Sequence, residues 1–344
     1  MGYREFRSDT MTRPSQAMRQ AMAAAEVGDD VCGEDPTVHR LEEMAAALLR
    51  MEAALFVPSG VFANQCAIGV HCQPGEEIIV SESAHVVAHE SGAAALLSGV
   101  QLRAVVPARE RYLTPQDVEP RIRVGEDVHH PRTRLIILEN ALSDGTVMPV
   151  EAMAEMARVA DNHRVSIHLD GARVFNAALA LDVAPCELSR HADSVSFCLS
   201  KGLGAPIGSL LCGAKEFIHR ARRRRKAMGG GMRQVGVLAA PGLLALEEGR
   251  RRLGEDHRRA RDLAVGLAAL PCVRVDLDAV QTNMVYAHLD HPTLSETDLV
   301  ERLWRRDIRV YPPLPEGIRF VLSSEVGDED VAAVIEAVRG ILRR

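Results

Sequence analysis

The sequence predicts an α/β protein whose mostly parallel sheet is covered by helices on both faces, followed by a smaller C-terminal α+β unit. Between about residues 53 and 213, short apolar segments alternate with helical ones, which is the pattern of parallel strands joined by crossover helices. The apolar runs are too continuous for a sheet with one face in water. After about residue 270, short strands and helices follow in an order that favours antiparallel pairing.

The first fifty residues are expected to form an N-terminal arm. Two helix-like patterns, at 14–26 and 36–51, flank the loop VGDDVCGED with its Gly and Asp breakers. Strand-like and helical segments then alternate. In chain order they are AALFVPSG, a helix from about Val61, EEIIVSES, a helix near Glu90, and VQLRAVV.

The second half of the predicted sheet continues this alternation. Its segments are TRLIILENA, helix 150–163, RVSIHLDGA, helix 173–180, DSVSFCLSKG and PIGSLLCG. The chain then becomes basic, RRRRKAMGGGMRQ, and runs through a long helix to about Ala269. We interpret the basic run 220–225 as a solvated helix face or a subunit contact, because no aromatic residues are interleaved with it.

The C-terminal part is expected to be a small α+β domain. It reads VRVDL, NMVYAHL, helix 295–306, IRVYPP, IRFVLS and helix 328–342. A chain of 344 residues exceeds the usual size of a single core. The sequence therefore predicts a large domain over residues 1–250, including the N-terminal arm, and a small domain over 251–344.

Composition excludes several classes of partner. The 41 Lys and Arg residues are outnumbered by 47 Asp and Glu, for a net charge of -6, which disfavours nucleic acid and anionic membranes. The seven cysteines form no Cys-x-x-Cys pair, and no apolar run approaches the roughly 20 residues of a membrane span. We therefore expect a reduced, cytoplasmic protein with no metal site and a small-molecule partner.

A lysine and a carboxylate stand where an α/β sheet places its ligand groups. Lys201 follows an apolar strand and precedes glycines, in SFCLSKGLGAPIG, where backbone can approach a flat ligand closely. Asp170 ends the strand SIHLDGAR at the carboxyl edge of the sheet and suits a pyridine nitrogen. Taken alone, Lys201 could be a solvated turn residue and Asp170 a helix cap.

An anion site is predicted where a strand gives way to a helix. Ser59 and Gly60 follow ALFVP and open the helix at VFANQ, so their N–H groups lie at a helix N-terminus. Ser-Gly is also an ordinary turn. Arg233, on the glycine-rich loop GGGMRQ, could bring a guanidinium to a phosphate within the chain or across a dimer.

In this order, the motifs resemble the L-threonine aldolase family of fold-type I pyridoxal-phosphate enzymes, within the aromatic-amino-acid β-eliminating lyase superfamily. The resemblance extends over roughly residues 6 to 245. The blocks that carry it are FRSDTMT, GDDVCGEDPTVHRLE, FVPSGVFANQ, ESAHVVAHE, RLIILEN, HLDGARVFNAA, SVSFCLSKGLGAPIGSLL and RRKAMGGGMRQVGVLAAPGLLAL. It implies an aspartate aminotransferase-like large domain with a small C-terminal domain, and pyridoxal 5'-phosphate as the cofactor.

The resemblance also implies a role for each matching residue of the cofactor site. Lys201 would form a Schiff base with the cofactor aldehyde, Asp170 would hold the pyridine nitrogen, and His85 would stack on the ring. Ser59 and Gly60 would bind the phosphate.

Further matching positions concern the neighbouring subunit and the substrate. Arg233 would contact the phosphate of a neighbouring subunit, so a homodimer or homotetramer with shared active sites is expected. Ser8, Arg173 and Arg319 would hold the amino-acid carboxylate, with Arg173 also beside the cofactor. A histidine suits the abstraction of a β-hydroxyl proton, and His129, in EDVHHPRT, aligns with the family's residue there.

The resemblance implies cleavage of L-threonine, L-allo-threonine or a related β-hydroxy-α-amino acid to glycine and an aldehyde. Where the family usually has Glu-Asn-Thr-His, this chain has Glu139, Asn140, Ala141 and Leu142, and after Arg319 it has Leu-Ser-Ser in place of a Thr-His ending. Both departures concern the substrate side chain. β-Elimination, racemisation or transaldolation therefore stay open as alternatives, as does a binding protein that has kept the fold.

Overall fold

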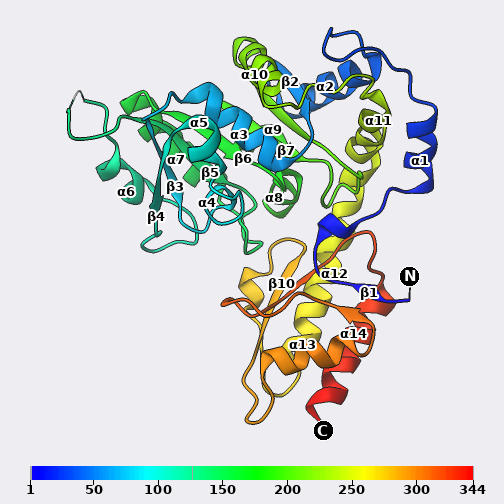
Figure 1. Cartoon of the computed structure of the whole chain (residues 1–344). Coiled ribbons are helices and arrows are strands. Elements are labelled where there is room, and N and C mark those ends of the chain that lie inside the picture. Colours follow the sequence, from blue (N-terminus) through cyan, green and yellow to red (C-terminus); the bar gives the residue numbers. More distant parts are fainter. Residues whose placement is uncertain (1, 126, 344) are drawn as a thin grey trace.

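The computed structural model describes residues 2–125 and 127–343, and its larger unit is built on a seven-stranded sheet (Figure 1). In sheet order the strands are β2 (Ala53–Val57), β8 (Ser209–Gly213), β7 (Ser194–Cys198), β6 (Ser166–Asp170), β5 (Thr133–Glu139), β3 (Glu77–Ser81) and β4 (Gln101–Val105). Neighbouring strands are parallel except at β8, which is antiparallel to both β2 and β7. The predicted α/β fold with a mostly parallel sheet is confirmed.

Helices cover both faces of this sheet, as the continuous apolar runs predicted. On one face pack α3 (Gly60–His71), α5 (Ala93–Ser98) and α10 (Lys215–Ala227); on the other pack α2 (Pro36–Leu49), α7 (Val150–His163), α8 (Val174–Ala180) and α9 (Pro185–Ser189). Alternate side chains of one strand enter different cores. Leu55 and Val57 pack toward α3 and α10, while Ala54 and Phe56 pack toward α2. Burial on both sides therefore removes the polar alternation of a half-exposed strand.

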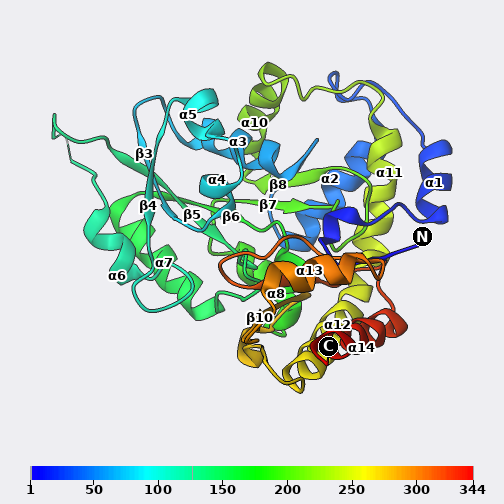
Figure 2. The same ribbon diagram turned by 60° about the horizontal axis from the view of Figure 1, so that its bottom comes forward.

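The smaller unit is an antiparallel sheet of three strands, in the order β12 (Ile318–Val321), β10 (Met284–Leu289), β9 (Val273–Arg274). It packs against α12 (Arg250–Ala268), α13 (Glu296–Trp304) and α14 (Asp328–Leu342), at the opposite end of the molecule from α10 (Figures 1 and 2). Helix α11 (Gly236–Leu244) continues through one wide turn, Ala245–Gly249, into α12. A single helical run thus links the two units.

The beginning of the chain packs with its end. Strand β1 (Arg4–Glu5) pairs in parallel with β11 (Ile308–Arg309), and the Phe6 carbonyl accepts a hydrogen bond from Val321 N–H at 2.9 Å. The Phe6 side chain lies in the core of the smaller unit. The division at residues 250 and 251 stays a prediction, but the first residues pack in the C-terminal unit before the chain reaches α1 (Gln16–Ala23).

The basic run 220–225 is only partly a solvated face. Arg225 is 1% exposed; its Nη2 bonds Asp30 Oδ2 at 2.6 Å and its Nη1 donates to the Phe56 carbonyl at 2.7 Å. Arg222 donates to Glu42 at 2.8 Å. These bonds fasten α10 to β2, to α2 and to the loop before α2. The expectation of a solvated helix face is therefore wrong for Arg225. Within the described residues, no helix is both long and apolar enough to cross a membrane.

The buried pair between Asp30 and Arg225 provides a test of this packing. Asp30→Ala leaves a buried guanidinium without its counter-charge, so we expect the free energy of unfolding in urea to fall by about 3–5 kcal/mol. Glu187→Ala is the control, because Glu187 of α9 forms a surface pair with Arg190 just after the helix, and its loss should leave stability nearly unchanged. Equal, small losses for both variants would contradict the structural role of this pair.

Candidate active site

Asp170 and Lys201 lie at the same edge of the sheet. Asp170 is the last residue of β6, and its Cα lies in register with Glu139 of β5 and Ser196 of β7, so it stands where the parallel strands end. Lys201 follows shortly after β7. Burial and the Asp170 charge raise the pKa of Glu139. The positive charge of Lys201 acts on the same carboxyl in the opposite direction. The structure therefore brings the predicted amine and carboxylate into one neighbourhood.

The loop that carries Lys201 is held in place at several points. Leu199 N–H donates to the Gly208 carbonyl at 3.0 Å, and Arg252 of α12 donates to the Gly202 carbonyl at 2.8 Å. Gly208 has φ +100°, and a Cβ there would lie 2.5 Å from the Phe56 ring, so only glycine fits. Among residues 2–125 and 127–343, no side chain hydrogen-bonds the Lys201 amine. A fixed backbone thus presents a free amine.

His85 stands beside the Asp170 carboxylate. It is the first residue of α4 (His85–Ala88); its N–H donates to Glu139 at 3.0 Å, and its Nδ1 lies 2.9 Å from Glu90 Oε1. Side-chain atoms of His85, Glu90 and Asp170 lie within 4.8 Å of one another. The hydrogen bond to Glu90 is the main reason that the pKa of His85 is raised, since burial acts in the opposite direction.

The predicted anion site lies at the N-terminus of α3. Ser59 is the N-cap of α3, and its exposed Oγ accepts from the Phe62 N–H at 3.2 Å. A Cβ on Gly60 would lie 2.8 Å from Cys198 Sγ, so glycine is needed for the helix to approach the sheet. Below it, on β8, the buried Ser209 Oγ has no hydrogen-bond partner among the described residues. An anion here would meet free helix N–H groups.

The three residues predicted to hold a carboxylate gather around the N-terminal segment. Arg319 Nη2 donates to the Arg7 carbonyl at 3.3 Å, and Arg319 Nε is buried with no partner in the described part of the chain. Ser8 follows Arg7 and is buried. Asp9 accepts two bonds from Arg173, at 2.8 Å from Nε and 2.6 Å from Nη2. The segment therefore lies between two guanidinium groups.

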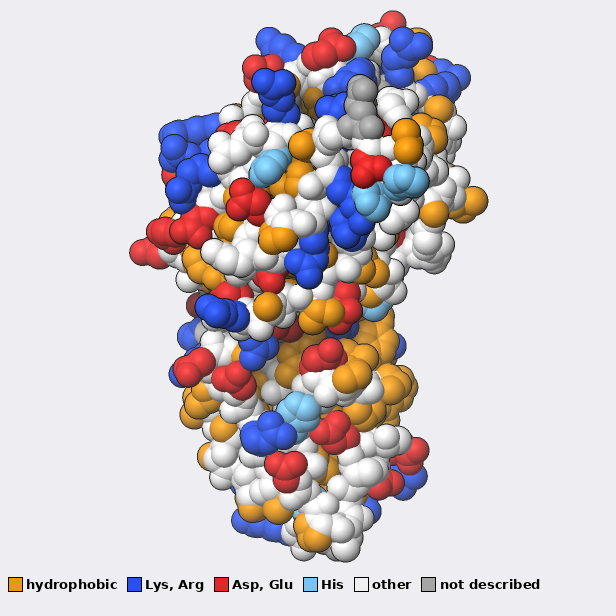
Figure 3. All heavy atoms as spheres, turned by 90° about the vertical axis from the view of Figure 1, so that its left-hand side faces the viewer, with side chains coloured by type: hydrophobic (Ala, Val, Ile, Leu, Met, Phe, Trp, Pro, Cys, Tyr) orange, Lys and Arg blue, Asp and Glu red, His pale blue; other side chains and the backbone are white. Residues whose placement is uncertain are grey.

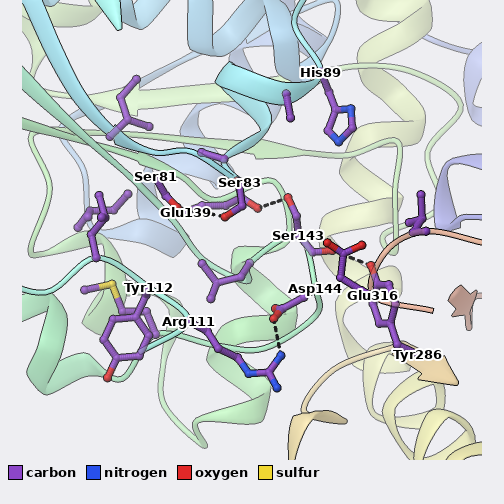
Figure 4. A pocket seen from close by; sticks show the side chains of 18 of the residues that line it. Ser81, Ser83, His89, Arg111, Tyr112, Glu139, Ser143, Asp144, Tyr286 and Glu316 are labelled. Atoms are coloured by element: carbon purple, nitrogen blue, oxygen red, sulfur yellow. Dashed lines mark hydrogen bonds and ion pairs between the residues drawn. The ribbon is translucent and has the colours of Figure 1, made fainter. Parts of the chain in front are cut away.

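A cavity of about 480 Å³ opens beside Glu139 (Figure 4). Side chains from β5 and the loop after it, including Glu139, Ser143 and Asp144, face Tyr286 of the smaller unit. Arg319 of the smaller unit also lines the cavity. Figure 3 shows apolar side chains gathered at the waist between the two units. The cavity thus adjoins the proposed carboxylate site through Arg319, and much of its lining is apolar.

Two predicted residues lie outside this cluster. Arg233 is exposed, and its Nη1 pairs with Asp29 at 2.8 Å on the loop before α2. His129 lies on the exposed loop at 127–132, where its N–H donates to Asp127 at 2.9 Å. That loop projects to the left of the sheet in Figure 1. A single chain does not bring either residue to Lys201, and their roles stay predictions.

Four polar residues of the site were not singled out from the sequence. Asp9 holds Arg173, Asn64 holds Asp170, Glu90 holds His85, and Glu139 holds the N-terminus of α4. All four lie in the blocks FRSDTMT, FVPSGVFANQ, ESAHVVAHE and RLIILEN. The motifs could therefore have pointed to these four residues as members of the site. Only the packing shows which partner each side chain contacts.

Comparisons with known proteins agree on one family. Its sequence profile, described as β-eliminating lyase, matches residues 5–290. Low-specificity L-threonine aldolase 1 of Arabidopsis thaliana is 42% identical over 332 residues, covering 95% of this chain and 93% of that protein. Low specificity L-threonine aldolase of Escherichia coli strain K12 is 40% identical over 341 residues, covering 99% of each. The structure of Leishmania major threonine aldolase superposes with a TM-score of 0.84 at 21% identity, covering 98% of this chain and 99% of that one.

The Glu90 contact predicts how His85 titrates. In Glu90→Gln the neutral amide cannot stabilise an imidazolium, while burial still favours the neutral ring, so the pKa of His85 should fall. His85 would then be neutral over a wider range of pH. NMR of the His85 ring across a pH series measures this. Glu82→Gln, at an exposed carboxylate three residues before His85, should leave the pKa in place; equal behaviour of the two variants would refute the assignment.

Proposed function

This chain belongs to the β-eliminating lyase family, and we propose that it uses pyridoxal 5'-phosphate to cleave β-hydroxy-α-amino acids to glycine and an aldehyde. L-Threonine and L-allo-threonine are the proposed substrates, because relatives at 40–42% identity over nearly the full length are named L-threonine aldolases. The observation that carries the proposal is the free Lys201 amine at the sheet edge where Asp170 ends β6.

The residues present fit this cofactor at each of its three polar ends. The helix N-terminus at Ser59 and Gly60, with the unpartnered Ser209 hydroxyl below, suits the phosphate. Lys201 would bond covalently to the aldehyde carbon with loss of water, and the buried Asp170 carboxylate would accept a hydrogen bond from the ring nitrogen. Orphaned polar atoms in a cradle are expected when a ligand normally satisfies them.

The cofactor, when bound, supplies a ring that accepts the electron pair left on Cα as the Cα–Cβ bond breaks. The chain's own residues orient the substrate. Ser8, Arg173 and Arg319 would hold its carboxylate, and a guanidinium fork suits that group because it donates two parallel hydrogen bonds. This grip would fix the orientation of the substrate at Cα, and so which of its bonds is placed to break.

A histidine is the proposed base for the β-hydroxyl proton. In His85 the Nδ1 atom is engaged with Glu90, which leaves Nε2 for the substrate or for the cofactor face. His129 is exposed, as is Arg233. We assign both to the site of a neighbouring subunit, which makes a homodimer or homotetramer with shared sites the functional unit. A cytoplasmic location is proposed because all seven cysteines are free thiols.

The loop at 139–146 is the reason to keep a second reaction in view. Leu142, where the family usually has a histidine, lines the cavity, and beside it Ser143 Oγ donates to Glu139 at 2.7 Å. β-Elimination, racemisation or transaldolation on a small amino acid would use the same cofactor groups. Release of pyruvate from serine, with no aldehyde from any β-hydroxy amino acid, would favour elimination over the aldolase reaction.

Replacement of Lys201 tests the cofactor linkage. The chain has only three lysines, at 201, 215 and 226. Lys201→Ala should lose the absorbance at about 420 nm that this cofactor gives when it is linked to a lysine amine. Release of aldehyde from L-threonine and L-allo-threonine should be lost with it. Lys215→Ala, at an exposed position on α10, should keep both. An unchanged spectrum and unchanged aldehyde release in Lys201→Ala would contradict the proposal.

Replacement of Arg319 tests the carboxylate site. Arg319→Lys keeps the charge but loses the planar fork, so we expect KM for L-threonine to rise about tenfold or more, with a smaller effect on kcat. Arg274→Lys is the matched control, because Arg274 lies on β9 of the same sheet and pairs with Asp290 at the surface. A KM equal to that of the control would show that Arg319 does not bind the substrate carboxylate.

A further inference from the structure

Asn64, on α3, has a fully satisfied buried amide at the centre of the site. It is 2% exposed. Its Nδ2 donates to Asp170 Oδ2 at 2.7 Å and to Glu90 Oε1 at 2.9 Å. Its Oδ1 accepts from Ser196 Oγ at 2.9 Å and lies 3.1 Å from His168 Nε2. Two donors and two acceptor positions are therefore all used, which is the full capacity of an asparagine side chain.

The partners determine which way this amide points. Carboxylates only accept, so the NH2 group must face Asp170 and Glu90, and Oδ1 must face two donors. His168 therefore carries its proton on Nε2, and its Nδ1 accepts from Ser194 Oγ at 2.9 Å. Ser194 in turn accepts from His71 Nε2 at 2.7 Å. Every donor in this row points toward the carboxylates.

The row depends on histidines that are neutral, with one ring proton each. Burial lowers the pKa of His168 to about 4 and is also the main reason that the pKa of His71 falls to about 3. At neutral pH each ring then has one donor and one acceptor nitrogen. Aligned bonds of this kind polarise one another, so the row strengthens the N–H groups of Asn64 as donors to Asp170.

The second arm of Asn64 leads to His85. Glu90 is 1% exposed; its Oε1 accepts from Asn64 and contacts His85 Nδ1, while its Oε2 accepts from Gln65 at 2.7 Å. One amide therefore joins the carboxylate proposed for the ring nitrogen to the imidazole proposed for the ring face. Other charged or titratable groups beside Asp170 are Glu139 on β5, His168 on β6 itself and Lys201 after β7.

Helix α3 carries residues for both ends of the proposed cofactor. Its N-terminus, at Ser59 and Gly60, is the proposed phosphate site, and Asn64 follows Gly60 by one turn. Four residues of helix extend about 6 Å, comparable with the distance from a phosphate to the far side of a six-membered ring. The same rigid element can thus locate both ends of the ligand.

We propose that Asn64 is a positioning residue for the cofactor: it holds the Asp170 carboxylate at the ring nitrogen and, through Glu90, the His85 imidazole at the ring face. The inference rests on the proposed function, because it presumes that pyridoxal 5'-phosphate occupies this site. Asn64 acts through Asp170 and His85 and has no contact of its own with the reacting atoms.

The test measures how the chain binds the cofactor and how the bound cofactor absorbs light, instead of turnover. Cofactor-free protein is titrated with pyridoxal 5'-phosphate, and the absorbance of the loaded protein is followed across pH. In Asn64→Ala the dissociation constant should rise about tenfold or more, because a hydrogen bond to a charged group is lost. The pH midpoint of the absorbance change should fall by about one unit, because a loosely held Asp170 stabilises a protonated ring nitrogen less.

Two further variants separate positioning from general packing. Ser196→Ala removes one donor to Asn64 Oδ1, so the dissociation constant should rise and the pH midpoint should fall, each by less than in Asn64→Ala. If Asn64→Ala does not fold, the Ser196→Ala result tests the proposal alone. Asn176→Ala is the matched control, because this buried amide bonds the His257 ring at 3.1 Å outside the row. It should lower the unfolding temperature and leave the pH midpoint in place.

The possible results are distinct. A higher dissociation constant and a lower pH midpoint in Asn64→Ala and Ser196→Ala, with an unchanged pH midpoint in Asn176→Ala, support the proposal. Folded Asn64→Ala and Ser196→Ala proteins that bind and titrate pyridoxal 5'-phosphate like the unaltered chain overturn it. Failure of the unaltered chain to bind pyridoxal 5'-phosphate would overturn the proposed function itself, which is a different outcome.

Discussion

The buried carboxylate of Asp170, and the hydrogen bonds that keep it in place, is the interaction on which the site depends. A carboxylate removed from water needs partners to offset its lost hydration. Among the residues that the structure describes, Asp170 has two such partners: the Asn64 amide at 2.7 Å and the Ala172 N–H at 3.1 Å. The parallel sheet makes this arrangement accessible, because the ends of β5, β6 and β7 meet at one edge and the N-terminus of α3 packs beside them.

The smaller unit contributes to this edge through the N-terminal segment and the loop after β5. Arg319 reaches the Arg7 carbonyl, two residues before Asp9, which binds Arg173 of the larger unit. Thr282 donates to the Gly145 carbonyl at 2.7 Å, and Tyr286 donates to the Ser143 carbonyl at 3.2 Å. These bonds all cross between the two units. The placement of the proposed substrate-binding residues is therefore coupled to the packing of the smaller unit.

Asp9 shows how one residue can serve both packing and chemistry. It is fully buried, and burial alone would favour its neutral form, yet the Arg173 charge and hydrogen bonds lower its pKa. The two oxygens of Asp9 take Nε and Nη2 of Arg173, so Nη1 is left for another acceptor. The buried pair fixes the plane of the guanidinium, which a mobile surface arginine could not do without a cost in entropy.

Sequence alone determined the features that depend on local order. Lys201, Asp170 and Ser59 each stand at the end of an apolar strand, and strand periodicity with the motif order placed them at one edge. Tertiary structure decided the rest, because Asn64 meets Asp170, Asp9 meets Arg173 and Asp30 meets Arg225 across more than a hundred residues. No local pattern encodes such pairs: a buried charge or amide finds its partner only when the topology of the sheet has brought distant segments together.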